Sequence, residues 1–476
     1  MNAHTAQALG AVGAVGLAVL LAATQRQARI AGLAAWAIGW VGVAVYLAPH
    51  GHHRLLAAAA VVGAAGAAAG AALVVRVPWL LAVAVLACVP ARFPVHVGST
   101  KANLLLPIYA VVAVAALALA WDLFGDGERS RPLGPLARPL AGLVAWQGLS
   151  FLWTNDVRQG AIELAFFVLP FGLLAAALAR LPWSRAWVLA LYVQLAFMGL
   201  LFAVIGIWQY ETRNIFWNPK VKVDNAYAPS GWFYRVNSVF YDPSIYGRFL
   251  VVAILASLVI VLLRRGDPLW QVAAVLVIVI TWAGLLPSFS QSSFAALLAA
   301  VVVAAVVVWR RGSLPLVAAA VVLVIAAVVV SPAVRRKASL SHVTSGRSTL
   351  VSTGVKLAYR HPLLGVGIGG FKRGYADLAH LKGREPKAAA SHTTPVTVAA
   401  ENGVVGLGLF LWLVGAALWT AFRRIRRSFE GASRLAFGLA LLAILVHCVF
   451  YNSLFEDPTF WGLLSLVVVG ARAVDA

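Results

Sequence analysis

The chain has 476 residues, of which 62% are hydrophobic and 11% charged, and its 38 Lys and Arg against 16 Asp and Glu leave a formal net charge of +22. A soluble fold of two or three domains could not bury so much apolar surface, so the composition excludes a soluble protein and indicates an integral membrane protein. The basic residues lie between apolar runs of bilayer length, which favours a topological role over a nucleic-acid partner. Cys88 and Cys448 each lie within an apolar run, so we expect neither a disulfide framework nor a thiolate metal site.

Apolar stretches of about 17–25 residues are long enough to cross a membrane as helices. They predict an all-α polytopic membrane protein with about 14 transmembrane helices, at residues 7–23, 30–48, 55–75, 104–121, 138–153, 161–180, 186–209, 245–263, 269–287, 292–309, 314–331, 395–421, 434–454 and 458–473. A shorter apolar run at residues 79–90 is a further candidate span.

Short loops that face the cytoplasm carry an excess of Lys and Arg, and this rule orients the spans. Arginines recur on alternate loops: Arg26 and Arg29; Arg129, Arg131 and Arg138; Arg180 and Arg185; Arg264 and Arg265; Arg310 and Arg311; Arg423, Arg424, Arg426 and Arg427. By this count two long loops, at residues 210–244 and 332–394, face outward, and with the 79–90 run counted as a span the N-terminus also lies outside. Because long loops commonly carry function, we expect the working face to be extracytoplasmic.

Four regions follow from this topology. They are the N-terminal transmembrane helices (1–137), the central transmembrane helices with the outer loop 210–244 (138–331), the large extracytoplasmic loop (332–394) and the C-terminal transmembrane helices (395–476).

The large loop holds eleven basic residues against Asp377 and Glu385, a net charge of +9. Long loops escape the positive-inside rule, so this charge needs another explanation. Two remain open: attraction to anionic lipid of the outer leaflet, or a pocket for a phosphorylated substrate.

The same loop is expected to contain a helix over residues 348–360, which ends before Pro362 because a residue that precedes proline disfavours the helical conformation. Ser345 or Ser348 can cap its start. Apolar residues at three- and four-residue spacing let one face pack, while Lys356 and Arg360 present charge.

Four polar residues near the predicted outer interface are candidates for the site. His392 directly precedes the span at 395–421, where a neutral imidazole can take a proton from a sugar hydroxyl. Glu401 lies within that span, and an intramembrane carboxylate must face a partner or a wet cavity. Arg248 lies one turn into another span and is expected to pair with an acid or with bound phosphate. Arg235 lies in the first long loop among aromatic residues typical of a membrane interface.

In their order along the chain, these motifs resemble those of the O-antigen ligase and polymerase superfamily of bacterial membrane glycosyltransferases, over roughly residues 140–465. The segments that carry the resemblance are residues 235–247, the serine-rich run 288–293, Gly346-Arg347 with the helix after it, His361-Pro362 with the glycine-rich run to Phe371, and His392 with residues 401–406.

The resemblance implies an inverting, metal-independent transfer of a glycan from a polyprenyl diphosphate carrier to an acceptor hydroxyl at the outer face of the cytoplasmic membrane. By similarity, Arg347 would bind the diphosphate and His392 would act on the acceptor hydroxyl. Many members carry Arg where this chain has Gln291, so Arg235 or Arg248 is the alternative source of that phosphate contact. We also assign Gln291, Lys356, Arg360 and Glu401 to the predicted substrate site.

Neither a metal nor another cofactor is expected. The outer loops hold no Asp-x-Asp motif that would bind a metal-complexed diphosphate. Cationic side chains would then stabilise the leaving diphosphate, a task that suits bidentate Arg. His50, His52 and His53 have the chemistry of metal ligands, but they lie in a short loop outside the resemblance.

The expected partners are a lipid-linked glycan donor, a glycan or lipid-glycan acceptor, and the bilayer of the bacterial cytoplasmic (inner) membrane. Polymerase and ligase both remain open, because the acceptor is recognised by loop shape; we favour a polymerase or a general glycan transferase. Two other classes fit a basic polytopic chain. One is a flippase or transporter of lipid-linked sugars, although no internal repeat is visible; the other is a scaffold subunit whose basic loop docks a partner.

Overall fold

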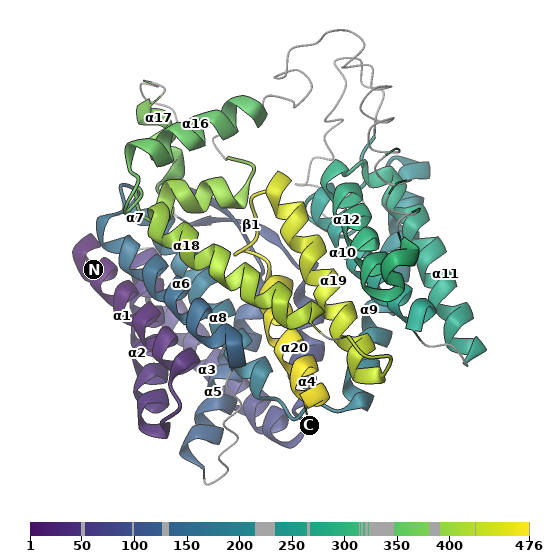
Figure 1. Cartoon of the computed structure of the whole chain (residues 1–476). Coiled ribbons are helices and arrows are strands. Elements are labelled where there is room, and N and C mark those ends of the chain that lie inside the picture. Colours follow the sequence, from purple (N-terminus) through teal and green to yellow (C-terminus); the bar gives the residue numbers. More distant parts are fainter. Residues whose placement is uncertain are drawn as a thin grey trace.

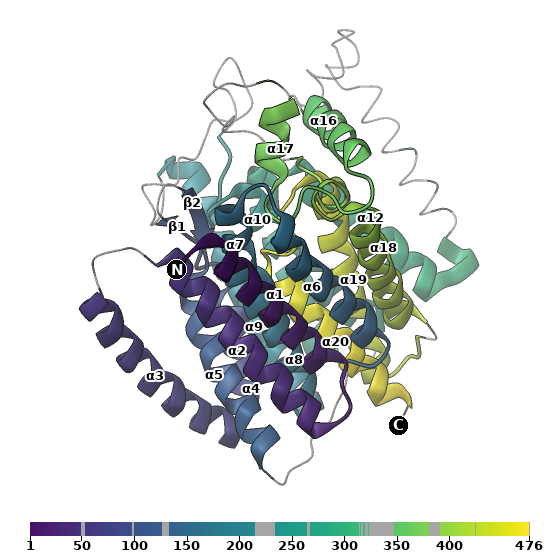
Figure 2. The same cartoon turned by 90° about the vertical axis from the view of Figure 1, so that its left-hand side faces the viewer.

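The computed structural model describes residues 1–48, 53–97, 100–125, 133–214, 234–263, 267–313, 347–378, 391–423 and 425–475, with single residues 315, 318, 322 and 380. This part of the chain is nearly all helical, and most of its helices run side by side in one bundle, with α16 and α17 at one end (Figure 1). The helix α3 lies at the edge of the bundle, where it packs on α5 (Figure 2).

The α-helices are α1 (Ala3–Ala22), α2 (Arg26–Leu47), α3 (His53–Arg76), α4 (Trp79–Cys88), α5 (Leu106–Phe124), α6 (Ala137–Ser150), α7 (Val157–Glu163), α8 (Leu169–Arg180), α9 (Arg185–Thr212), α10 (Pro243–Leu263), α11 (Pro268–Leu285), α12 (Gln291–Trp309), α16 (Arg347–Arg360), α17 (Phe371–Leu378), α18 (Thr394–Phe422), α19 (Phe429–Phe450) and α20 (Pro458–Asp475).

Ten helices among the described residues are long and apolar enough to cross a membrane: α1, α2, α5, the run Val157–Arg180, α9, α10, the run Pro268–Ser288, α12, α18 and α19. Shorter apolar helices occur at Val61–Arg76, Trp79–Cys88 and Pro458–Gly470. The multi-pass architecture is therefore confirmed, whereas the count of about 14 spans is not. The stretch predicted at 138–153 forms only the 14-residue α6, and most of 314–331 lies outside the described residues.

A short β-hairpin departs from the all-α prediction. The strands β1 (Phe93–Val97) and β2 (Thr100–Leu104) pair antiparallel, with Val95 opposite Ala102. Proline ends the preceding helix at Pro90, and the next residues alternate apolar and polar side chains, which suits a strand. The hairpin is too short to be detected when hydropathy is averaged over a window of membrane length.

The most buried span contains a π-helical segment, Leu164–Val168, between α7 and α8. A π segment shifts the backbone hydrogen bonds and leaves carbonyl groups that need other partners. Two tryptophans of α2 supply them. Trp40 Nε1 donates to the Ala165 carbonyl at 2.7 Å, and Trp36 Nε1 donates to the Leu169 carbonyl at 3.0 Å.

Small residues bring α1 and α2 into backbone contact. A Cβ atom placed on Gly39 would lie 2.3 Å from the Gly13 Cα atom and 2.5 Å from the Leu9 carbonyl oxygen. Small residues at such crossings allow membrane helices to gain close van der Waals packing in the absence of a hydrophobic driving force.

Gly39→Ala is therefore expected to lower the free energy of unfolding by about 1–3 kcal/mol, the usual cost of overpacking. Thermal unfolding of the purified protein in detergent measures it. Gly408→Ala is the matched control, because a Cβ atom there meets no atom within 4 Å. Identical melting temperatures of the two variants would contradict the close α1–α2 contact at Gly39.

The two long loops are described in part. Residues 215–233 of the first loop, and residues 323–346 and 381–390 in and beside the second, lie outside the described residues. The helix predicted at 348–360 is confirmed as α16, and α17 is a second helix in the same region.

Candidate functional site

A glycine-rich loop, residues 361–370, connects α16 to α17. Gly365, Gly367 and Gly369 all have positive φ, at 68°, 86° and 74°. A Cβ atom on Gly367 would lie 2.4 Å from the Thr154 Cα atom, because the loop backbone lies directly against the segment that precedes α7. Thr154 Oγ1 donates to the Ile368 carbonyl at 2.8 Å, which fixes the loop to that segment. The glycines are thus required by backbone conformation and by close approach.

The loop docks on a break in α18. Gly403 has non-helical dihedral angles, φ 64° and ψ −166°, which interrupt the helix. The freed backbone groups bond to the loop: Val366 N donates to the Ala400 carbonyl at 3.0 Å, Gly367 N donates to the Glu401 carbonyl at 2.9 Å, and Val404 N donates to the Pro362 carbonyl at 2.8 Å. The break and the loop therefore satisfy each other's backbone hydrogen bonds, as a site within a membrane requires.

Glu401 has the partner that an intramembrane carboxylate needs. Its side chain is buried, and Oε1 accepts a hydrogen bond from the backbone N–H of Phe371 at 3.1 Å. Phe371 is the first residue of α17, so the carboxylate also lies at the positive end of that helix. This expectation from the sequence is confirmed, although the partner is a backbone group.

Asn402 ties the same break to the end of α6. Its side-chain oxygen accepts from Ser150 Oγ at 3.1 Å, and its carbonyl accepts from Trp146 Nε1 at 2.9 Å. Ser150 Oγ in turn accepts from the Ile368 N–H at 3.1 Å. Glu401 thus contacts the glycine-rich loop directly, through its carbonyl, and Asn402 contacts it through Ser150.

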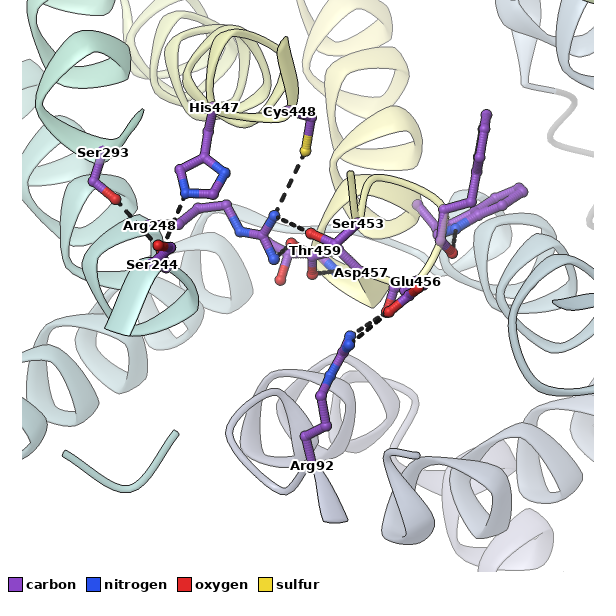
Figure 3. A network of polar contacts seen from close by, with 12 residues as sticks. Arg92, Ser244, Arg248, Ser293, His447, Cys448, Ser453, Glu456, Asp457 and Thr459 are labelled. Carbon is purple, nitrogen blue, oxygen red and sulfur yellow. Dashed lines mark hydrogen bonds and ion pairs between the residues drawn. The ribbon is translucent and has the colours of Figure 1, made fainter. Parts of the chain in front are cut away.

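A second polar cluster surrounds the start of α10. Arg235 is buried, and its Nε donates to the Ser288 carbonyl at 2.8 Å while Nη2 donates to Ser244 Oγ at 3.3 Å. The Ser244 carbonyl accepts from Ser293 Oγ at 3.4 Å and lies 3.1 Å from His447 Nε2 (Figure 3). The structure thus joins the Arg235 motif to the serine-rich run, which sequence order alone did not indicate.

Arg248, one turn further along α10, forms an ion pair with Asp457 in the turn between α19 and α20. The Nη2 to Oδ2 distance is 2.9 Å, and both side chains are only 5% exposed. Nη1 also donates to Ser453 Oγ at 3.0 Å. Of the two partners expected for Arg248, an acid or bound phosphate, the structure contains the acid.

Arg92 approaches the same turn from another side and pairs with Glu456 at 2.7 Å (Figure 3). From the sequence, Arg248 was expected to pair with an acid or a phosphate, but Asp457 was not identified as that acid, and the pair of Arg92 with Glu456 was missed. One signal was available, because Arg248 and Asp457 are each a rare charge at the outer end of a predicted span.

The segment that carries His392 is tied to this second cluster. His392 has a left-handed backbone, φ 54°, and its side chain is half-buried. Two residues later, Thr394 Oγ1 donates to Asn452 Oδ1 at 3.2 Å, and Asn452 adjoins the Ser453 that holds Arg248. The start of α18 and Arg248 therefore both contact the same α19–α20 turn.

The remaining predicted residues stay predictions. Arg347 begins α16, but its side chain is outside the described part of the chain. Lys356 and Arg360 have exposed side chains, while Leu357 between them is buried. Gln291 begins α12 and is exposed.

No group of three or more His, Cys, Asp or Glu side chains in the described residues has the arrangement of a metal site. His50 and His52, and the side chain of His53, lie outside those residues.

These features define a multi-pass membrane protein with one polar cluster around the break in α18 and a second around the start of α10. Residues 276–411 match the family model of O-antigen ligase. The matched region contains the serine-rich run, α16, the glycine-rich loop, His392 and the break at Gly403. The match confirms the resemblance to the O-antigen ligase and polymerase superfamily over this segment of the chain. None of the curated proteins matches the chain significantly in sequence.

Proposed function

We propose that the protein is a membrane glycosyltransferase, which moves a glycan from a polyprenyl diphosphate carrier to an acceptor hydroxyl at the outer face of the bacterial cytoplasmic membrane. The observation that carries the proposal is the O-antigen ligase match over residues 276–411. The hydrogen bonds of Ser288 with Arg235 and of Thr394 with Asn452 support it. The arginines on alternate loops support an outward orientation of the two long loops and of the helix ends beside them.

The diphosphate is assigned to arginine side chains. Arg347 at the start of α16 is the first candidate, and Arg235 lies beside the serine-rich run that the matched region contains. Guanidinium groups present paired N–H donors that fit phosphate oxygens, and they stabilise the charge that develops on a leaving diphosphate. The reaction needs no metal in this scheme.

His392 is assigned to the acceptor. Its neutral imidazole takes the proton of the acceptor hydroxyl while the hydroxyl oxygen attacks the anomeric carbon of the donor sugar. The bond from that carbon to the diphosphate oxygen breaks, and the polyprenyl diphosphate leaves with the electron pair. A single displacement of this kind inverts the anomeric configuration.

The test follows release of the diphosphate lipid from a polyprenyl diphosphate oligosaccharide by the purified protein in detergent. His392→Ala is expected to reduce release by about 10²- to 10⁴-fold, the usual contribution of a general base. Arg347→Ala should also reduce release strongly, whereas EDTA should leave the rate unchanged. His380→Ala, which removes an exposed histidine of the same region, is the matched control and should leave the rate unchanged.

Failure to release diphosphate from any donor would contradict a transferase and leave a flippase or transporter of lipid-linked sugars as the next hypothesis. Release that persists at full rate in His392→Ala would contradict the assigned base alone. When a second lipid-linked repeat and a lipid-glycan are offered as competing acceptors, the product separates polymerase from ligase.

A further inference from the structure

An apolar cavity of about 490 Å³ lies between α4, α9, α10, α19 and α20. On α10 its lining extends from Ile245 to Leu263, a rise of roughly 27 Å, which is close to the thickness of the hydrocarbon core of a bilayer. Most of its walls are Leu, Val, Ile and Ala side chains, which offer water few hydrogen bonds. A hydrocarbon chain fits a space of this length and polarity.

At one end of the cavity, the charged side chains are buried and already form ion pairs. Arg248 and Asp457 form their ion pair there with both side chains 5% exposed. Arg92, also at this end, has a side chain 8% exposed and pairs with Glu456. Each arginine has its own acid, so this end gives an anionic headgroup neither access nor surplus positive charge.

At the opposite end the lining is basic and its charged side chains are exposed. Arg185 and Arg427 line the cavity there, and Glu430 pairs with Arg185 at 2.7 Å, which leaves a formal surplus of one positive charge. The Arg185 side chain is 72% exposed and Arg427 is exposed, so both are accessible to a headgroup. Trp183 also lines this end, and an amphipathic aromatic side chain is typical of a membrane interface. The positive-inside rule places these loops in the cytoplasm.

We propose that the cavity binds an anionic phospholipid of the cytoplasmic leaflet. Its phosphate lies at Arg185 and Arg427, and one acyl chain extends between α9, α10 and α19 toward the Arg248–Asp457 ion pair. The difference in charge between the two ends determines this orientation, because only the Arg427 end has exposed arginines and a surplus of positive charge. The lipid would fill space beneath the polar cluster at Ser244 and stabilise the helices that hold it.

Native mass spectrometry of the delipidated protein tests the proposal, with dioleoyl phosphatidylglycerol as the probe and dioleoyl phosphatidylcholine as the neutral comparison. Phosphatidylglycerol should bind more tightly and raise the melting temperature. Arg427→Ala should weaken its binding about fivefold, the effect of removing one interfacial cation, and leave phosphatidylcholine binding unchanged. Arg138→Ala, at another exposed arginine on the same side by the topology rule, should change neither.

Ala436→Phe tests the acyl-chain position, because Ala436 lines the cavity and a ring there fills it. Binding of phosphatidylglycerol should fall while the melting temperature of the lipid-free protein is kept. Ala432→Leu is the smaller filling variant if the first does not fold, and Ala110→Phe on the exposed face of α5 is the control. Equal binding of the two phospholipids, or binding insensitive to both Arg427→Ala and the filling variants, would overturn the proposal. So would displacement of phosphatidylglycerol by an equimolar polyprenyl phosphate, which would assign the cavity to the carrier lipid.

Discussion

Asp457→Ala is expected to lower the free energy of unfolding by about 3–5 kcal/mol, because it leaves the buried Arg248 guanidinium without its acid. The pair is 2.9 Å apart with both side chains 5% exposed, so water cannot replace the lost carboxylate. Thermal unfolding in detergent should show a large fall in melting temperature. Glu456→Ala is the matched control in the adjacent position. Its side chain is 40% exposed, and Arg92 keeps its hydrogen bond to the carbonyl of residue 456, so the loss of stability should be smaller than in Asp457→Ala.

A double variant separates the structural role of this pair from substrate binding. Arg248→Met with Asp457→Leu removes both charges and fills the space with apolar groups, so stability should recover most of what Asp457→Ala loses. If the double variant folds and still transfers glycan at the normal rate, Arg248 does not bind the diphosphate. If it folds and the rate falls, the guanidinium contributes to the reaction beyond its ion pair.

The helices that cross the membrane could be predicted from the sequence, because each needs a long apolar run and the charges between runs are sparse. The interruptions of regular helix structure could not be predicted in this way. Glycine is frequent in membrane helices, so Gly403 does not differ in hydropathy from Gly408 or Gly415 on the same helix. The π segment at 164–168 is likewise hidden inside a continuous apolar stretch. Both depend on partners from distant parts of the chain.

The candidate site was predictable to a similar extent. A carboxylate or a guanidinium within an apolar run is conspicuous, which is why Glu401 and Arg248 were singled out. Their partners were not predictable, because one is the backbone N–H of Phe371 and the other, Asp457, is 209 positions further along the chain. Hydropathy locates a buried charge, whereas only the packing of the helices determines what neutralises it.

Gly403→Ala is the second substitution for which we expect a large effect. It should displace the glycine-rich loop and slow glycan transfer. The φ and ψ of 64° and −166° are accessible to glycine alone, and forcing another residue into such a region costs about 1–3 kcal/mol. A Cβ atom would also lie 2.1 Å from the Leu363 carbonyl oxygen, so the loop must move away from α18. The hydrogen bonds from Val366 and Gly367 to the Ala400 and Glu401 carbonyls would then be lost.

Two measurements distinguish displacement of the glycine-rich loop from general unfolding. Limited proteolysis should cleave residues 361–370 faster in Gly403→Ala, because the loop no longer docks, while the lipid-embedded helices remain resistant. Diphosphate release should fall at the same time, because the loop sets the position of α16 and hence of Arg347 relative to α18. Gly415→Ala on the same helix is the control, since a Cβ atom there meets no atom within 4 Å. Full activity with unchanged proteolysis in Gly403→Ala would mean that α18 tolerates a continuous helix at this point, and that the docked loop does not position the reacting groups.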